Sequence, residues 1–183
     1  MNQQSTSNHN ESNDPFLKVT VDAMRDAFGF TPHPFQRQVI PHIIKMKDDL
    51  SSPCLLVHGI GGDKSSIYQT VGIIKGGIIL VIQNTLSLSS DQMSKISVLS
   101  SKYDGVHSLQ LDSIKKEDEK LKICASLSSI TTTTNKTIYI FASPEVLVKP
   151  PWPTLIESII LKRTLSFVCV DEVHLFVQFS ISF

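Results

Sequence analysis

The sequence predicts an α/β fold with a doubly wound, mainly parallel β-sheet and helices on both faces. Short apolar runs alternate with helical segments, as parallel sheets with crossover helices require. A cluster of glycines also stands between the first apolar run and a helix start. The five predicted strands are 54–58, 78–83, 107–111, 137–142 and 165–170.

Length and composition fit one domain preceded by a tail. The chain has 183 residues, 41% of them hydrophobic and 19% charged, which is enough to build a sizeable core. Residues 1–14 are rich in Asn, Gln and Ser and predict a disordered tail, whereas 15–183 predict the folded domain. A helix is expected from Pro15 to Phe28, stopped by Gly29.

Charge, cysteine content and hydropathy limit the functions and cellular compartments that fit this chain. Lys+Arg and Asp+Glu both number 17, so any nucleic-acid contact must come from local patches rather than bulk charge. The three cysteines lie far apart, and we expect Cys54 and Cys169 to be core thiols in a reducing, intracellular compartment. No apolar run approaches the ~18–20 residues that a membrane span requires.

The first apolar run leads into a loop suited to binding phosphate. Three glycines precede Lys64 and Ser65, close to the pattern Gly-x-x-x-x-Gly-Lys-Ser/Thr. Such a loop turns backbone N–H groups and a helix N-terminus toward an anion, while the lysine reaches the β/γ-phosphates and the hydroxyl ligates Mg²⁺. An ordinary strand-to-helix connection is the alternative. The glycines are Gly59, Gly61 and Gly62.

Asp63 departs from this pattern, because the residue before the lysine should be glycine. A Cβ crowds the phosphates there and a carboxylate repels them. At about 5 Å and an effective dielectric of about 20, the repulsion is roughly 3 kcal/mol per phosphate charge. Even half of that would weaken nucleotide binding roughly tenfold.

Polar residues follow several later strands. Ser87, Asp91 and Gln92 follow the second run, where hydroxyls and free N–H groups can hold a phosphate or cap a helix. Ser143-Pro144-Glu145 follow the fourth run and predict a helix start. After the fifth run, Asp171 can hold the Mg²⁺ hydration shell, and Glu172 can orient and deprotonate an attacking water.

In this order, the motifs resemble those of RecQ-like superfamily 2 helicases. The segment around Gln36, from Pro32 to Pro41, looks like the Q motif that precedes the P-loop in DEAD-box and related helicases. Three further segments match looser patterns of the RecQ-like group, and the DExH box is Asp171-Glu-Val-His174. Those segments are Ser87-Leu-Ser-Ser-Asp-Gln92, Phe141-Ala-Ser-Pro-Glu145 and Gln178-Phe179.

The resemblance implies a first RecA-like domain that binds ATP and Mg²⁺. Gln36 would read adenine, His174 and Gln178 would couple the nucleotide site to its surroundings, and Lys64 would join Asp171 and Glu172 in catalysis. It also implies DNA rather than RNA as partner and, in a eukaryote, a nuclear location. The nucleic-acid track would include Ser87, Asp91, Gln92, Ser143, Pro144 and Glu145.

Helicases of this group work with a second RecA-like domain, which supplies arginines worth around 10³–10⁵ in rate. We expect the chain to be C-terminally incomplete, to require that domain in trans, and to be inactive alone as a helicase. A degenerate relic without nucleotide binding, and a non-enzymatic module for nucleic acid or protein, stay open as alternatives.

Overall fold

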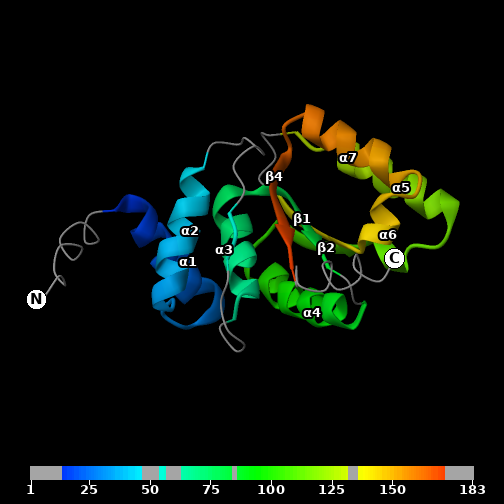
Figure 1. Cartoon of the computed structure of the whole chain (residues 1–183). Helices are drawn as coiled ribbons and strands as arrows, with labels where there is room; N and C mark the ends of the chain where they lie inside the picture. Colours follow the sequence, from blue (N-terminus) through cyan, green and yellow to red (C-terminus); the bar gives the residue numbers. More distant parts are fainter. Residues whose placement is uncertain (1–13, 47–53, 57–62, 84–85, 132–135, 172–183) are drawn as a thin grey trace, which may run out of the picture. The chain divides into compact units, whose positions relative to one another are not determined.

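The structure is a computed structural model that describes residues 14–46, 54–56, 63–83, 86–131 and 136–171 (Figure 1). The chain divides into two compact units, Met1–Ile74 and Lys75–Phe183, which are described separately. The assignment of residues 15–183 to a single domain stays a prediction.

The first unit contains α1 (Pro15–Phe28), α2 (Pro34–Lys45) and all but the last residue of α3 (Ser65–Lys75). Helices α1 and α2 pack against each other and bury Met24, Ile40 and Ile43. As predicted, α1 ends at Gly29, which takes a left-handed conformation with φ 76°.

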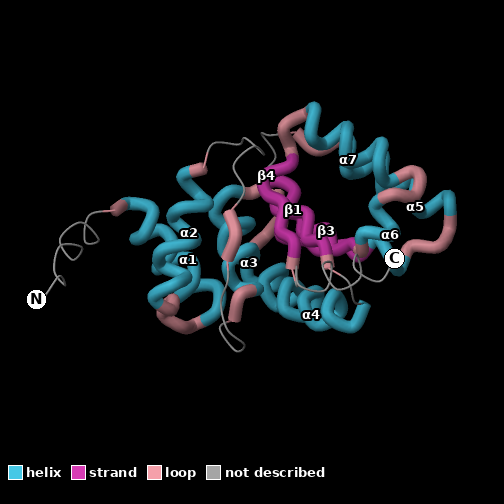
Figure 2. The backbone as a smooth tube through the Cα atoms, viewed as in Figure 1, coloured by secondary structure: helices cyan, strands magenta, loops and turns pink. Residues whose placement is uncertain are grey.

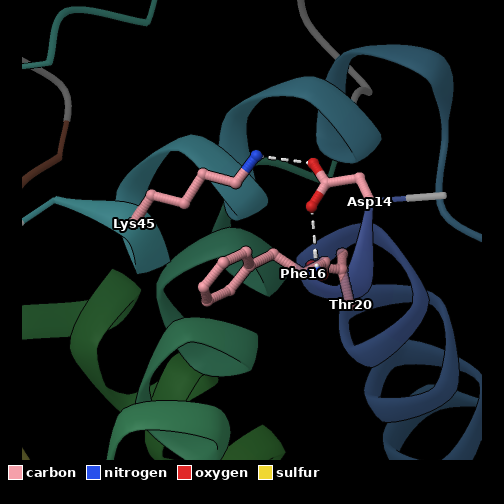
Figure 3. Close-up of polar contacts among 4 residues, drawn as sticks. All are labelled: Asp14, Phe16, Thr20 and Lys45. Atoms are coloured by element: carbon pink, nitrogen blue, oxygen red, sulfur yellow. Dashed lines mark hydrogen bonds and ion pairs between the residues drawn. The ribbon is translucent and has the colours of Figure 1, made fainter. Parts of the chain in front are cut away.

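A polar clasp joins the start of α1 to the end of α2 (Figure 3). Asp14 caps α1 by accepting from the backbone N–H of Phe16 (3.0 Å), and its other oxygen pairs with Lys45 Nζ (2.6 Å). The same ammonium lies 5.4 Å from the centre of the Phe16 ring. The hydrogen bond from Lys45 holds the pKa of the Asp14 carboxyl below its ordinary value.

The second unit is built on a four-stranded parallel sheet in the order β2-β3-β1-β4 (Figure 2). This confirms the predicted α/β class and is consistent with a RecA-like domain. The elements after α3 are β1 (Gly77–Ile82), α4 (Leu86–Lys102), β2 (Val106–Gln110), the 3-10 turn η2 (Leu111–Ser113), α5 (Glu117–Ser128), β3 (Thr137–Ala142), α6 (Pro144–Leu147), α7 (Trp152–Leu161) and β4 (Leu165–Val170).

Helices of this unit cover both faces of the sheet (Figure 1). Helices α5 and α7 lie on one face, where Trp152, Leu155 and Ile159 of α7 join the even-numbered side chains of β1 and β3 in one core. Helix α4 lies on the other face and buries Ile96 and Leu99. The central strands β1 and β3 are therefore apolar almost throughout, as their sequences predict.

Two of the predictions about apolar segments were wrong. Residues 54–56 form no strand, and Cys54 and Leu55 are exposed, so Cys54 is not a core thiol. The rest of that predicted strand, 57–58, lies outside the described residues. An apolar run becomes a strand only where a neighbouring backbone pairs with it, and pairing is not a local property of the run.

Among the described helices, none is long and apolar enough to cross a membrane.

Candidate nucleotide and nucleic-acid sites

In the first unit, Gln36 joins the start of α2 to the start of α3. Its side chain is fully buried, and Nε2 donates to the backbone carbonyl of Asp63 (3.3 Å) and to Ser66 Oγ (2.9 Å). Oε1 accepts from the N–H of His33 (2.8 Å). Gln36, predicted to bind adenine, thus contacts the two residues that flank Lys64 and Ser65 of the predicted phosphate-binding loop.

Asp63 has the backbone conformation expected of the glycine it replaces. Its φ is 45°, in the left-handed region that L side chains rarely adopt and that Asp tolerates better than most. Its carbonyl accepts from Gln36 Nε2 and from Ser66 Oγ (2.8 Å), which holds it at the start of α3. These two hydrogen bonds fix the backbone of Asp63 just before α3.

Lys64 and Ser65 follow at the N-terminal end of α3, and both side chains are half-buried. The helix start directs backbone N–H groups and a partial positive charge outward, as phosphate binding requires. Six further predicted site residues lie outside the described residues: Gly59, Gly61, Gly62, Glu172, His174 and Gln178.

In the second unit, predicted track residues lie on α4 at the carboxyl end of β1. Asp91 is exposed, whereas Gln92 is buried in the first half of the helix. Ser87 belongs to the first turn of α4, and its side chain is outside the described part of the structure. Next to them, Gln83 Nε2 donates to Ser89 Oγ, and both side chains are buried.

Ser143 caps α6, as its sequence predicts, and is also clamped to Asp112. Ser143 Oγ accepts from the N–H of Val146 (3.4 Å) and donates to Asp112 Oδ1 (2.6 Å). The Ser143 N–H donates to Asp112 Oδ2 (2.9 Å). One carboxylate on η2 thus holds the turn that contains Pro144 and Glu145.

Sequence reasoning missed Asp112, because nothing in its local sequence marks it. The usable signal was topological. Asp112 lies two residues after the end of β2 and Ser143 directly follows β3, and the carboxyl ends of neighbouring parallel strands meet at one edge of the sheet.

Asp171 continues the β4 ladder, since its N–H donates to the carbonyl of Ile82 at the end of β1 (2.9 Å). It therefore lies at the carboxyl edge of the sheet, as predicted. Burial, helped by the Asp171 carboxylate, raises the pKa of the nearby Cys169 thiol to about 12. The described residues contain no group of three or more His, Cys, Asp or Glu suited to direct coordination of a metal.

These observations define an α/β protein with polar groups at the carboxyl ends of parallel strands, the usual place for ligands in such folds. No protein-family model matches the chain. Over 153 residues it is 23% identical to ATP-dependent DNA helicase Q5 of Rattus norvegicus and 22% identical to that of Mus musculus. The match covers 82% of this chain and 14% of each relative, and supports a helicase-like relationship.

Proposed function

We propose that this chain is the first RecA-like, ATP- and nucleic-acid-binding domain of a RecQ-like DNA helicase. The contact of Gln36 with Asp63 and Ser66 carries the proposal, because it joins the Q-motif segment to the end of the glycine loop. The distant similarity to two proteins described as ATP-dependent DNA helicases supports the same assignment.

The residues at the start of α3 fit the phosphate end of Mg²⁺-ATP in all but one respect. Lys64 would neutralise the β/γ-phosphates, and the Ser65 hydroxyl would ligate Mg²⁺. The glycines Gly59, Gly61 and Gly62 would supply the converging N–H groups. The Asp63 carboxylate opposes them by adding negative charge beside the phosphates.

Gln36 would stabilise the loop as well as bind adenine. Both Nε2 hydrogens are used inside the protein, and one lone pair of Oε1 accepts from His33. For Gln36 to donate to adenine, the longer bond to Asp63 would have to be exchanged. We therefore propose that adenine binding breaks the hydrogen bond from Gln36 to the Asp63 carbonyl. Binding at the adenine end of the nucleotide would thereby affect the loop at its phosphate end.

The remaining roles follow the helicase pattern. Asp171 would hold Mg²⁺ through water, Glu172 would orient and deprotonate the attacking water, and His174 and Gln178 would couple this site to the DNA. The DNA track would run over the turn at Ser143-Pro144-Glu145, which Asp112 clamps, and over Ser87 and Asp91. Gln92, which is buried in α4, would position this helix rather than contact DNA. Hydrolysis would require a second RecA-like domain.

The test is a titration of a fluorescent ATP analogue with Mg²⁺ into the wild-type protein, Asp63→Gly and Lys64→Ala. We expect wild-type binding that Lys64→Ala abolishes and that Asp63→Gly strengthens roughly tenfold, through removal of the carboxylate. Lys18→Ala, at an exposed position of α1, is the matched control and should bind like wild type.

A relic that has lost nucleotide binding is the second candidate, and the Asp63 carboxylate is the observation that favours it. In that case the wild-type protein binds no analogue. Binding restored by Asp63→Gly would identify a helicase fold inactivated at one residue. Absence of binding by all variants would contradict the proposed function.

A further inference from the structure

At the amino edge of the sheet in the second unit, each of the four strands is preceded by at least one basic residue. Because all four strands are parallel, the segments that enter them lie at the same edge. Backbone hydrogen bonds join these segments: Gly77 N–H to Lys136 O (2.8 Å), Thr137 N–H to Gly105 O (3.0 Å) and Ile78 N–H to Thr164 O (2.9 Å). The basic residues, here called the amino-edge row, are Lys75, Lys102, Lys136, Lys162 and Arg163.

The row concentrates positive charge in a chain whose net charge is zero. The four entering segments contain one acidic residue, Asp104, in their sequences. Lys102, Lys136, Lys162 and Arg163 are exposed, and Lys75 is half-buried. Neighbouring strands lie about 4.8 Å apart, so the row extends over about 15 Å.

Helix ends account for three members of the row. Lys75 and Lys102 stand in the last turns of α3 and α4, where the helix dipole favours a cation. Lys162 Nζ donates to the carbonyl of Ser128 at the end of α5 (2.6 Å).

Lys136 and Arg163 have no such role. Their side chains make no hydrogen bond or ion pair within the described part of the chain. Arg163 also follows the C-cap of α7 with a φ of 54°, at a helix position where glycine is strongly preferred. A strained arginine and a lysine without a partner among the described residues lie on the same edge, which favours a ligand over the fold as the reason for this charge.

We propose that the amino-edge row binds the phosphate backbone of a nucleic acid, on the edge opposite the predicted track. A line of cations along a sheet edge fits a linear polyanion, which Lys and Arg bind by releasing its counterions. The choice of nucleic acid over other polyanions rests on the proposed function. The row would hold a flanking part of the strand without reading its sequence.

The proposal is tested by fluorescence anisotropy with labelled oligo(dT), in the absence of ATP. An oligomer of about 20 nucleotides is used, because a small binding module covers about 4–16 nucleotides. The full chain is titrated over a series of salt concentrations. The key variant, Lys136→Gln/Arg163→Gln, removes the two charges that make no hydrogen bond or ion pair with any described residue. The matched control, Lys18→Gln/Lys122→Gln, removes the same charge from exposed positions on α1 and α5.

In the key variant, we expect the slope of log affinity against log salt to fall by about 1.4, or about 0.7 per lost phosphate contact. Its affinity at low salt should fall roughly tenfold. The control and the charge-conserving variant Lys136→Arg/Arg163→Lys should both behave like wild type. Circular dichroism of every variant verifies that it is folded.

Three results would overturn the proposal. The first is that the wild-type protein fails to bind oligo(dT), and the second is that the key variant and the control lose the same amount of oligo(dT) affinity. The third result is that Lys136 and Arg163 are needed for binding to phosphatidylserine vesicles but not for binding to oligo(dT). Failure of the proposed function is seen separately. Suppose that no variant binds the ATP analogue but oligo(dT) binding still depends on Lys136 and Arg163. The proposed role of the amino-edge row is then supported, and the proposed nucleotide site is contradicted.

Discussion

Gln36 and Asp63 show how single residues hold the candidate nucleotide site together. Gln36 is fully buried, although amide side chains are mostly exposed, and its three bonds satisfy its amide and fix the end of the glycine loop. Asp63 retains a left-handed backbone while adding negative charge. The hydrogen bonds of Gln36 therefore favour the loop conformation that nucleotide binding needs, whereas the charge of Asp63 opposes the binding of phosphate.

Replacing Gln36 by methionine tests its bracing role. Gln36→Met keeps the volume but removes three hydrogen bonds, so we expect it to lower the free energy of unfolding by about 2 kcal/mol. Gln38→Met, the same change at an exposed position of α2, should cost less than about 0.5 kcal/mol. Urea denaturation measures the free energy of unfolding of both variants. Equal losses would show that the hydrogen bonds of Gln36 do not stabilise the fold.

At the scale of secondary-structure elements, close contacts between neighbours decide the arrangement. The Asp14–Lys45 clasp joins α1 to α2, and the Asp112–Ser143 clamp joins η2 to α6. In the sheet, β1 begins at Gly77, whose φ is 80° and whose Cα faces the carbonyl of Thr164 and the side chain of Ser166. A Cβ at Gly77 would lie 3.0 Å from that carbonyl and overlap Ser166 Oγ.

Alanine at Gly77 should therefore destabilise the sheet. The left-handed conformation costs an L residue about 1–2 kcal/mol, and the clash adds about 1–3 kcal/mol, so we expect a loss of about 3 kcal/mol. Gly29→Ala is the matched control, because Gly29 has a φ of 76° but no atom within 4 Å of an added Cβ. It should cost about 1 kcal/mol in urea denaturation. Similar losses for the two variants would contradict the clash.

For the whole molecule, the three cysteines report on different environments. Cys54 is exposed, Cys124 and Cys169 are half-buried, and burial raises the pKa values of Cys124 and Cys169. Charge is also uneven across the molecule: the chain is neutral overall, yet the amino edge of the sheet is basic. Bulk charge therefore says little about which surface meets a polyanion.

Alkylation of the native protein at pH 8 should modify Cys54 first and Cys169 last. A pKa of about 12 instead of 9.0 lowers the thiolate fraction of Cys169 about a thousandfold, and the thiolate is the reactive form. Peptide mass spectrometry follows each site, and unfolding in urea should equalise the three rates. Modification of native Cys169 as fast as Cys54 would contradict the raised pKa of the Cys169 thiol.

The sequence by itself determined whatever depends on local pattern. The β-branched and apolar runs predicted β3 and β4 at their observed bounds, and Gly29 and Ser143 predicted a helix end and a helix start. Only the tertiary structure decided that 54–56 forms no strand, that Gln36 binds Asp63 and Ser66, that Asp112 clamps Ser143, and that basic residues share one edge. The reason is physical: each of these outcomes depends on which distant backbone or side chain becomes a neighbour, and strand order and packing determine that.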